Sequence, residues 1–236
     1  KPQKPLSVLI KGRTIQLLSH IILSSSSVYS SLYEVVNEET KSSLAKRILA
    51  ALLDHLEEHI IPFLSSPTKF TTHDSQQYLQ LCSTCIQFLL NMSTSNEGIR
   101  MLRLRMRLES IQEDEPSRWS QSTFGCVVLV LDGTLSFADK VKENGGAVLK
   151  KSSNISRVLD TIATQCFALF KTLLRFVEKQ RETSSKSTTL LALTCEHRTI
   201  FQSCLAKIQT NEELKKAARG LIEELIVDAE KESVDK

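Results

Sequence analysis

Two histidines and a glutamate in the first quarter of the chain have the spacing of a metal-dependent hydrolase. His55, Glu58 and His59 match the pattern H-x-x-E-H, in which two histidines one helical turn apart bind zinc and the glutamate acts as a base. A catalytic zinc also needs a third protein ligand, and no carboxylate on a matching helix downstream supplies one. We therefore interpret the histidines as residues at the core–solvent boundary of an amphipathic helix. A zinc-dependent hydrolase remains an alternative function.

A pair of cysteines could bind a metal or exchange disulfides. Cys82 and Cys85 form a C-x-x-C, and residues 195–197 (Cys-Glu-His) with Cys204 could provide a second half-site. Zinc-binding and redox pairs of this kind lie in a turn or at a helix N-terminus, whereas this pair falls in the middle of a predicted helix. We predict that both thiols pack in the core. All six cysteines lie in apolar, helix-like contexts, which favours reduced thiols over a disulfide framework.

Residues 131–135 (LDGTL) imitate the first motif of haloacid-dehalogenase-like phosphatases, D-x-D-G-T. The nucleophilic carboxylate of that motif would sit at Val130, so no aspartyl intermediate can form. The sequence also lacks a P-loop, a G-x-G-x-x-G loop and a G-x-S-x-G elbow. We therefore expect a protein that is not an enzyme, and no cofactor or metal is implied.

Three arginines fall on one face of a predicted helix. Arg100, Arg103 and Arg107 would form a basic ridge able to grip phosphates or an acidic partner segment, although acidic residues 113–115 could simply balance a solvated face. The whole chain has 30 Lys and Arg against 27 Asp and Glu, a net charge of +3. That balance argues against a dedicated nucleic-acid binder or a polybasic membrane protein. A nucleic-acid or chromatin adaptor stays an alternative, and no nearby aromatic residues offer a stacking platform.

The elements that carry these residues are predicted to be helices. Only 7 of the 236 residues are Gly and 5 are Pro, which favours long helices with short connections. Apolar residues recur at helical spacing through residues 6–21 and 28–36. Residues 122–138 are apolar enough for a buried strand, but we predict a helix because the run exceeds strand length and no other strand is available to pair with it. Further helices are predicted over about residues 49–60 (ended by Pro62), 75–92, 99–111, 155–177, 190–208 and 211–229.

Polar stretches divide these helices within a single domain that spans residues 1–236. We predict polar loops near residues 65–74, 112–121 and 182–189, with Asp74 as the N-cap of the helix that follows the first loop. No stretch approaches eighteen uninterrupted apolar residues, and the first residues do not read as a secretory signal. We therefore expect no membrane partner and an intracellular location, in the cytoplasm or the nucleus.

Three phrases resemble helix junctions of armadillo repeats. Residues 89–93 followed by 96–102 resemble the end of one repeat's third helix running into the first helix of the next. Residues 131–136 with 143–149 resemble the same junction, and residues 211–225 are similar to a terminal third helix. Such repeats run about 40 to 47 residues, so the chain would hold about five. The resemblance implies an all-α, armadillo- or HEAT-like α-solenoid of stacked helical repeats.

The resemblance also implies a function. The order of the phrases is similar to that in the meiotic heat-shock-factor-binding protein family and in rotatin-type centriolar scaffolds. It implies a non-enzymatic scaffold that binds a linear peptide or a helix of a partner protein within a larger assembly, related to meiotic recombination or to centrioles. The apolar ends of such a solenoid would also suit a homodimer.

Two further residues are candidates for partner contact. In armadillo repeats an asparagine at the position of Asn91 holds the backbone of an extended peptide through its amide, and a simple helix C-cap is the other interpretation of this residue. Trp119, the only tryptophan, could anchor a partner or pack against the core. Together with Arg100, Arg103 and Arg107, these residues form the predicted binding site.

Overall fold

The computed structural model describes residues 5–24, 31–37, 42–66, 72–103, 123–143, 153–181 and 216. These residues are almost entirely helical, so the predicted all-α class is confirmed for this part of the chain. Its only extended structure is a short antiparallel pair, β1 (Val35–Asn37) with β2 (Ser42–Ser43). The helical period predicted through residue 36 is therefore wrong at its end, where two β-branched valines favour the strand.

The described helices agree with the predicted ones in type more closely than at their ends. Residues 123–138 of the segment predicted at 122–138 do form a helix, and it continues to residue 143. The helix predicted from residue 75 begins three residues earlier, so Asp74 lies in its first turn rather than at its N-cap, and its carboxylate still favours the helix N-terminus. The helical elements are α1 (Pro5–Ser24), α3 (Leu44–His55), η1 (a π-helical turn, Leu56–Ile60), α4 (Ile61–Ser65), α5 (Thr72–Met92), α6 (Asn96–Arg103), α7 (Thr123–Glu143) and α8 (Ser153–Arg181).

Pro62 does not end the helix that precedes it, contrary to our prediction. The helix passes from α3 through η1 into α4 without a break, and the N–H of Ile61 bonds the carbonyl of Leu56, five residues back. A proline ring in a regular α-helix would clash with the carbonyl four residues before it, here that of Glu58. The wider π turn relieves this clash, because it shifts the carbonyls that precede the proline.

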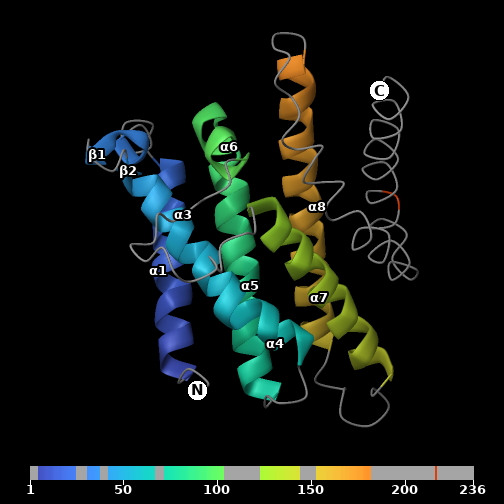
Figure 1. Cartoon of the computed structure of the whole chain (residues 1–236). Helices are drawn as coiled ribbons and strands as arrows, with labels where there is room; N and C mark the ends of the chain where they lie inside the picture. The colour runs from blue at the N-terminus through green and yellow to red at the C-terminus, as the bar shows by residue number, and fades with distance from the viewer. Residues whose placement is uncertain are drawn as a thin grey trace, which may run out of the picture.

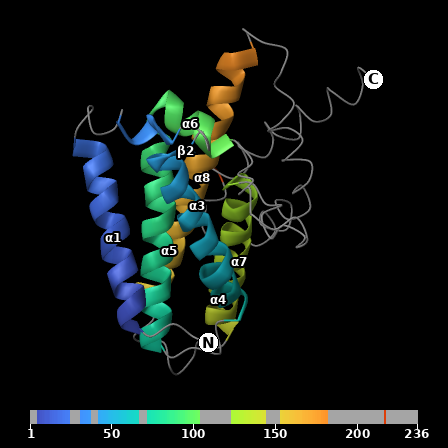
Figure 2. The ribbon, with the colours of Figure 1, turned by 60° about the vertical axis from the view of Figure 1, so that its left-hand side comes forward.

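The described helices lie in two layers. Helices α1, α5 and α8 lie side by side with α5 in the middle, and all three run in the same direction (Figure 1). Segment α3–α4 and helix α7 run in the opposite direction across one face of that layer, as the rotated view shows (Figure 2). The chain therefore alternates between the layers as it passes from α1 through α3–α4, α5 and α7 to α8.

The core fills the space between these layers. Phe63 of α4 stacks on Tyr78 of α5 with ring centroids 4.9 Å apart, and it meets Phe137 of α7 at 5.6 Å. Where α4 crosses α7, a Cβ at Gly133 would lie 2.8 Å from the Cβ of Leu64, so only glycine allows this close approach. Among the largest fully buried side chains are Leu49, Leu53, Leu56, Ile60, Leu79, Ile86, Phe88 and Phe170.

Several predicted elements lie outside the described residues. These are the loops at 112–121 and 182–189, residues 67–71 of the first loop, and the helix at 190–208. Of the helix predicted at 211–229 only Lys216 is described, and it is helical. Within the described part, no helix combines the length and the apolar character that a membrane span requires.

Candidate functional site

The H-x-x-E-H histidines differ in their surroundings. His59 is half-buried, as predicted for the core–solvent boundary, but His55 is buried with 8% of its surface exposed. The two rings lie 4.9 Å apart between centroids, and the Nζ of Lys11 on α1 is 3.5 Å from Nδ1 of His55. Our placement of His55 at the boundary was wrong, because its ring is buried and the Lys11 side chain of α1 reaches it.

The electrostatics around His55 keep its ring neutral. Burial lowers the pKa of His55 to about 4, and the positive charge of Lys11 and the neighbouring His59 act in the same direction. Burial also lowers the pKa of His59, with Lys11 adding to the effect and Glu58 opposing it. No three His, Cys, Asp or Glu side chains converge on a metal position in the described residues. The Lys11 ammonium beside Nδ1 would repel a cation bound there.

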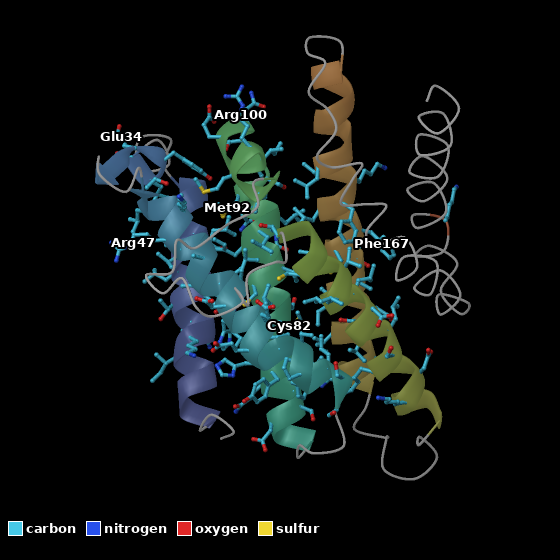
Figure 3. All side chains as sticks on the ribbon, viewed as in Figure 1. Glu34, Arg47, Cys82, Met92, Arg100 and Phe167 are labelled. Carbon is cyan, nitrogen blue, oxygen red and sulfur yellow. The ribbon has the colours of Figure 1, made fainter. Side chains whose placement is uncertain are left out.

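The C-x-x-C cysteines pack in the core, as predicted. Cys82, Cys85 and Cys166 are fully buried and form no disulfide, and Cys82 lies at the centre of the helices (Figure 3). Burial raises the pKa of the Cys82 thiol well above its usual value and that of Cys85 to about 12. These thiols are therefore neutral at physiological pH, which suits packing rather than metal or redox chemistry. Cys195 and Cys204 lie outside the described residues.

The phosphatase-like phrase at 131–135 lies in the middle of helix α7. Thr134 donates its hydroxyl hydrogen bond to the carbonyl of Val130 at 2.7 Å, one helical turn back. The first of the armadillo-like phrases does mark a helix junction, because α5 ends at Met92 and α6 begins at Asn96. The second phrase does not, since residues 131–136 lie seven residues or more before the end of α7.

Asn91 lies at the last turn of α5, where it is only 9% exposed. Its Nδ2 donates to Oγ of Ser19 on α1 at 3.2 Å, and its Oδ1 accepts from Nε2 of Gln87 at 2.9 Å. The amide therefore joins two helices of the same layer. Its predicted contact with a bound peptide stays a prediction. Such a contact would have to use the hydrogen-bonding capacity of the Asn91 amide that these two bonds do not occupy.

The bonds of Asn91 belong to a longer chain of side chains, which we call the amide ladder. On α8, Gln165 donates through Nε2 to Oε1 of Gln87 at 2.8 Å and accepts from Oγ of Ser83 at 3.1 Å. The ladder therefore links α8 to α5 and α5 to α1, using uncharged groups throughout. Its members are Ser83, Gln165, Gln87, Asn91 and Ser19.

A surface groove between α1 and α5 lies on the same polar side of α5. No residue of α5 between Ser75 and Met92 is charged, and the exposed or half-exposed positions of that stretch are mostly Gln, Ser and Thr. Gln16 of α1 and Gln80 of α5 line the two sides of the groove, and Gln80 is exposed whereas Gln16 is half-buried. The groove is lined by Gly12, Arg13, Gln16, Gln77, Gln80, Leu81 and Thr84.

The side chains that line this groove can form hydrogen bonds. A carboxamide offers two N–H donors and a carbonyl acceptor, which match the C=O and N–H of a polypeptide backbone. The groove contains one cation, Arg13, and no carboxylate or thiol. Sequence reasoning did not find it, although the uncharged glutamines along residues 76–87 were a signal that could have pointed to it.

Of the other predicted contact residues, the structure describes only the side chain of Arg100, which does not line the groove. Arg100 is exposed and projects from α6 at one end of the molecule (Figure 3). Arg103 is the last described residue of α6, and Arg107 and Trp119 lie outside the described residues. The structure therefore does not bring Asn91 and the arginines together at one described site.

The described residues are almost entirely helical, lie in two layers and leave an uncharged surface on α5 between Ser75 and Met92. No family model, no curated protein and no solved structure matches the chain.

Proposed function

We propose that this protein is a non-enzymatic scaffold that holds a linear segment of a partner protein within a larger assembly. The observation that carries the proposal is the α1–α5 groove, whose Gln16, Gln80 and Thr84 side chains suit the backbone of an extended chain. The α5 side of the groove carries no charge and Arg13 is the groove's single cation, which favours a polypeptide over a nucleic acid, because nucleic-acid binding depends on neutralising several phosphates.

The arrangement of the helices supports the same proposal. Helices α1, α5 and α8 run in parallel in one layer while the chain returns through the other, which is the alternation that stacked helical repeats require. In this proposal the α1–α5–α8 layer forms the binding side of an armadillo- or HEAT-like solenoid. Arg100 and Arg103 on α6 would then meet acidic side chains of the same partner beyond the groove.

The test is a selection of peptides from a random library displayed on phage, with the full chain as bait. Selected peptides should bind in fluorescence anisotropy, and the double substitution Gln16→Met and Gln80→Met should weaken them about tenfold or more, because it removes two neutral hydrogen-bonding groups. Gln76→Met is the matched control, since Gln76 is exposed on α5 outside the groove.

Two results would contradict the proposal. In one, no peptide is enriched over an unrelated helical protein of similar size. In the other, selected peptides bind the double variant as tightly as the native chain. A steep loss of affinity between 50 and 200 mM salt would instead indicate phosphate-like electrostatic binding, for which a protein with six or more contacts loses about a thousandfold.

A further inference from the structure

Helix α1 carries an apolar stripe on the side that faces away from the rest of the molecule. Ile10 is 58% exposed and Leu17 is 61% exposed, although both are large apolar residues. They are seven residues apart, so they lie two helical turns apart on the same side of α1. Thr14 and Arg13 are exposed between them, whereas Ser19 on the opposite side of the helix is buried.

The stripe lies at the edge of the α1–α5–α8 layer. Helix α5 contacts both of its neighbours in that layer, but among the described helices α1 packs in the layer against α5 alone (Figure 2). Two exposed apolar side chains at a spacing of seven form the pattern that a second amphipathic helix can cover. The stripe adjoins the groove at Arg13, which lines both surfaces and donates to Oε1 of Gln16 at 3.2 Å, whereas Ile10 and Leu17 lie outside the groove.

The charges of α1 indicate what kind of helix fits. Its twenty residues include Lys11, Arg13 and His20 but no Asp or Glu. Lys11 turns toward His55 of α3, so the cation between Ile10 and Leu17 is Arg13. A second copy of α1 would bring Arg13 close to its own counterpart in either orientation, because this residue lies midway between the two apolar positions. Like charges there oppose self-association, and a carboxylate at that point favours it.

We propose that the stripe of Ile10, Arg13 and Leu17 docks an acidic amphipathic helix of a partner protein. Such a helix has apolar residues at positions i and i+7, which cover Ile10 and Leu17, and a Glu or Asp at i+3 or i+4, which pairs with Arg13. The proposal shares Arg13 with the groove but rests on Ile10 and Leu17 outside it, and the molecule would then hold a linear segment and a helix on two adjoining surfaces of α1.

The test uses two synthetic alanine-based helices with Leu at i and i+7, one carrying Glu and the other Lys at i+3 and i+4. Binding to the full chain is measured by fluorescence anisotropy. The Glu helix should bind at least tenfold more tightly than the Lys helix, and Leu17→Gln should weaken it about tenfold. Arg13→Glu should reverse the preference between the two helices. Leu44→Gln is the matched control, because Leu44 is also an exposed apolar residue but begins α3.

Three outcomes would overturn the inference. Binding of the Glu helix that Leu17→Gln leaves unchanged would place its site elsewhere. If both helices bind equally tightly, or if neither binds, Arg13 does not select an acidic helix. A dimer of the full chain in analytical ultracentrifugation that Leu17→Gln dissociates would show that a second copy covers the stripe. Because peptides selected for the groove should still bind the Leu17→Gln variant, failure here can be distinguished from failure of the proposed function.

Discussion

Gly98 lies in the first turn of α6, where the chain has just reversed after α5. The hydroxyl of Ser95 accepts a hydrogen bond from the N–H of Gly98 at 3.0 Å and so caps the helix. A Cβ at Gly98 would overlap the carbonyl oxygen of Met92. This residue therefore permits the tight junction that the armadillo-like phrase at residues 89–102 indicated.

We expect Gly98→Ala to lower the free energy of unfolding by about 3 kcal/mol, because the backbone of Met92 has to move. Gly12→Ala is the control, since its Cβ would meet Cδ1 of Leu81 at an ordinary 3.6 Å. Because alanine is the better helix former, Gly12→Ala should stabilise the protein by about 0.8 kcal/mol. Urea unfolding of both variants measures the free energy of unfolding. Equal changes in the two variants would contradict the close approach of Gly98 to the carbonyl of Met92.

Burial of His55 makes the stability depend on pH. Its pKa is about 4 in the folded protein and close to 6.5 when unfolded, so the unfolded state binds the proton more readily between these values. The contribution of neutral, buried His55 to the free energy of unfolding is therefore present above pH 6.5 and is lost as the pH falls toward 4. Between pH 7 and pH 5 we expect a loss of about 2 kcal/mol from this residue.

The measurement is urea unfolding of the native chain and of His55→Leu at pH 7 and pH 5. The variant should lose about 2 kcal/mol less than the native chain over this interval, with His59 causing part of the loss that remains in both. The same pH dependence in both proteins would show that His55 is not buried as described.

At the scale of the elements, the amide ladder fixes the register of three parallel helices. Gln87 is its central member, since it bonds Gln165 of α8 and Asn91 at the end of α5. Gln87→Met keeps the approximate shape of the side chain but removes the hydrogen-bond partner of both Gln165 and Asn91. We therefore expect the free energy of unfolding to fall by about 1.5 kcal/mol. Gln76→Met on the exposed surface of α5 should change the stability by less than about 0.5 kcal/mol.

A double-mutant cycle checks whether the ladder acts through direct bonds. The combined variant Gln87→Met with Gln165→Met should cost less than the sum of the single variants, by about 0.5 kcal/mol or more. Additive costs would mean that the two carboxamides are not coupled.

The sequence predicted most helices because their period is a local signal. Helix ends were less predictable, as Pro62 shows, because a π turn can admit a proline that would end a regular helix. The strand at Val35–Asn37 was missed because its partner is a segment of only two residues. The predicted position of Asn91 on α5 was correct, but its burial depends on Ser19, which is 72 residues away in the sequence.

At the scale of the whole molecule, the layer order is what the sequence did not reveal. Composition indicates helices, but only the contacts of α5 with α1 and α8 show that these three share a layer. The neutral glutamine surface and the net charge of +3 agree in disfavouring a nucleic acid as the main ligand. The spacing of the arginines indicated that Arg100 lies on a helix, but not that this residue projects at one end of the described helices rather than beside the groove.

The central claim is that a bound peptide occupies the α1–α5 groove. The most direct measurement is a nuclear magnetic resonance titration of the ¹⁵N-labelled full chain with a selected peptide, following the side-chain amide signals of glutamine. We predict that the signals of Gln16 and Gln80 shift in proportion to binding while that of Gln76 stays in place. If the signals of Gln16 and Gln80 stay in place while the protein becomes saturated with peptide and other signals shift, the account is contradicted.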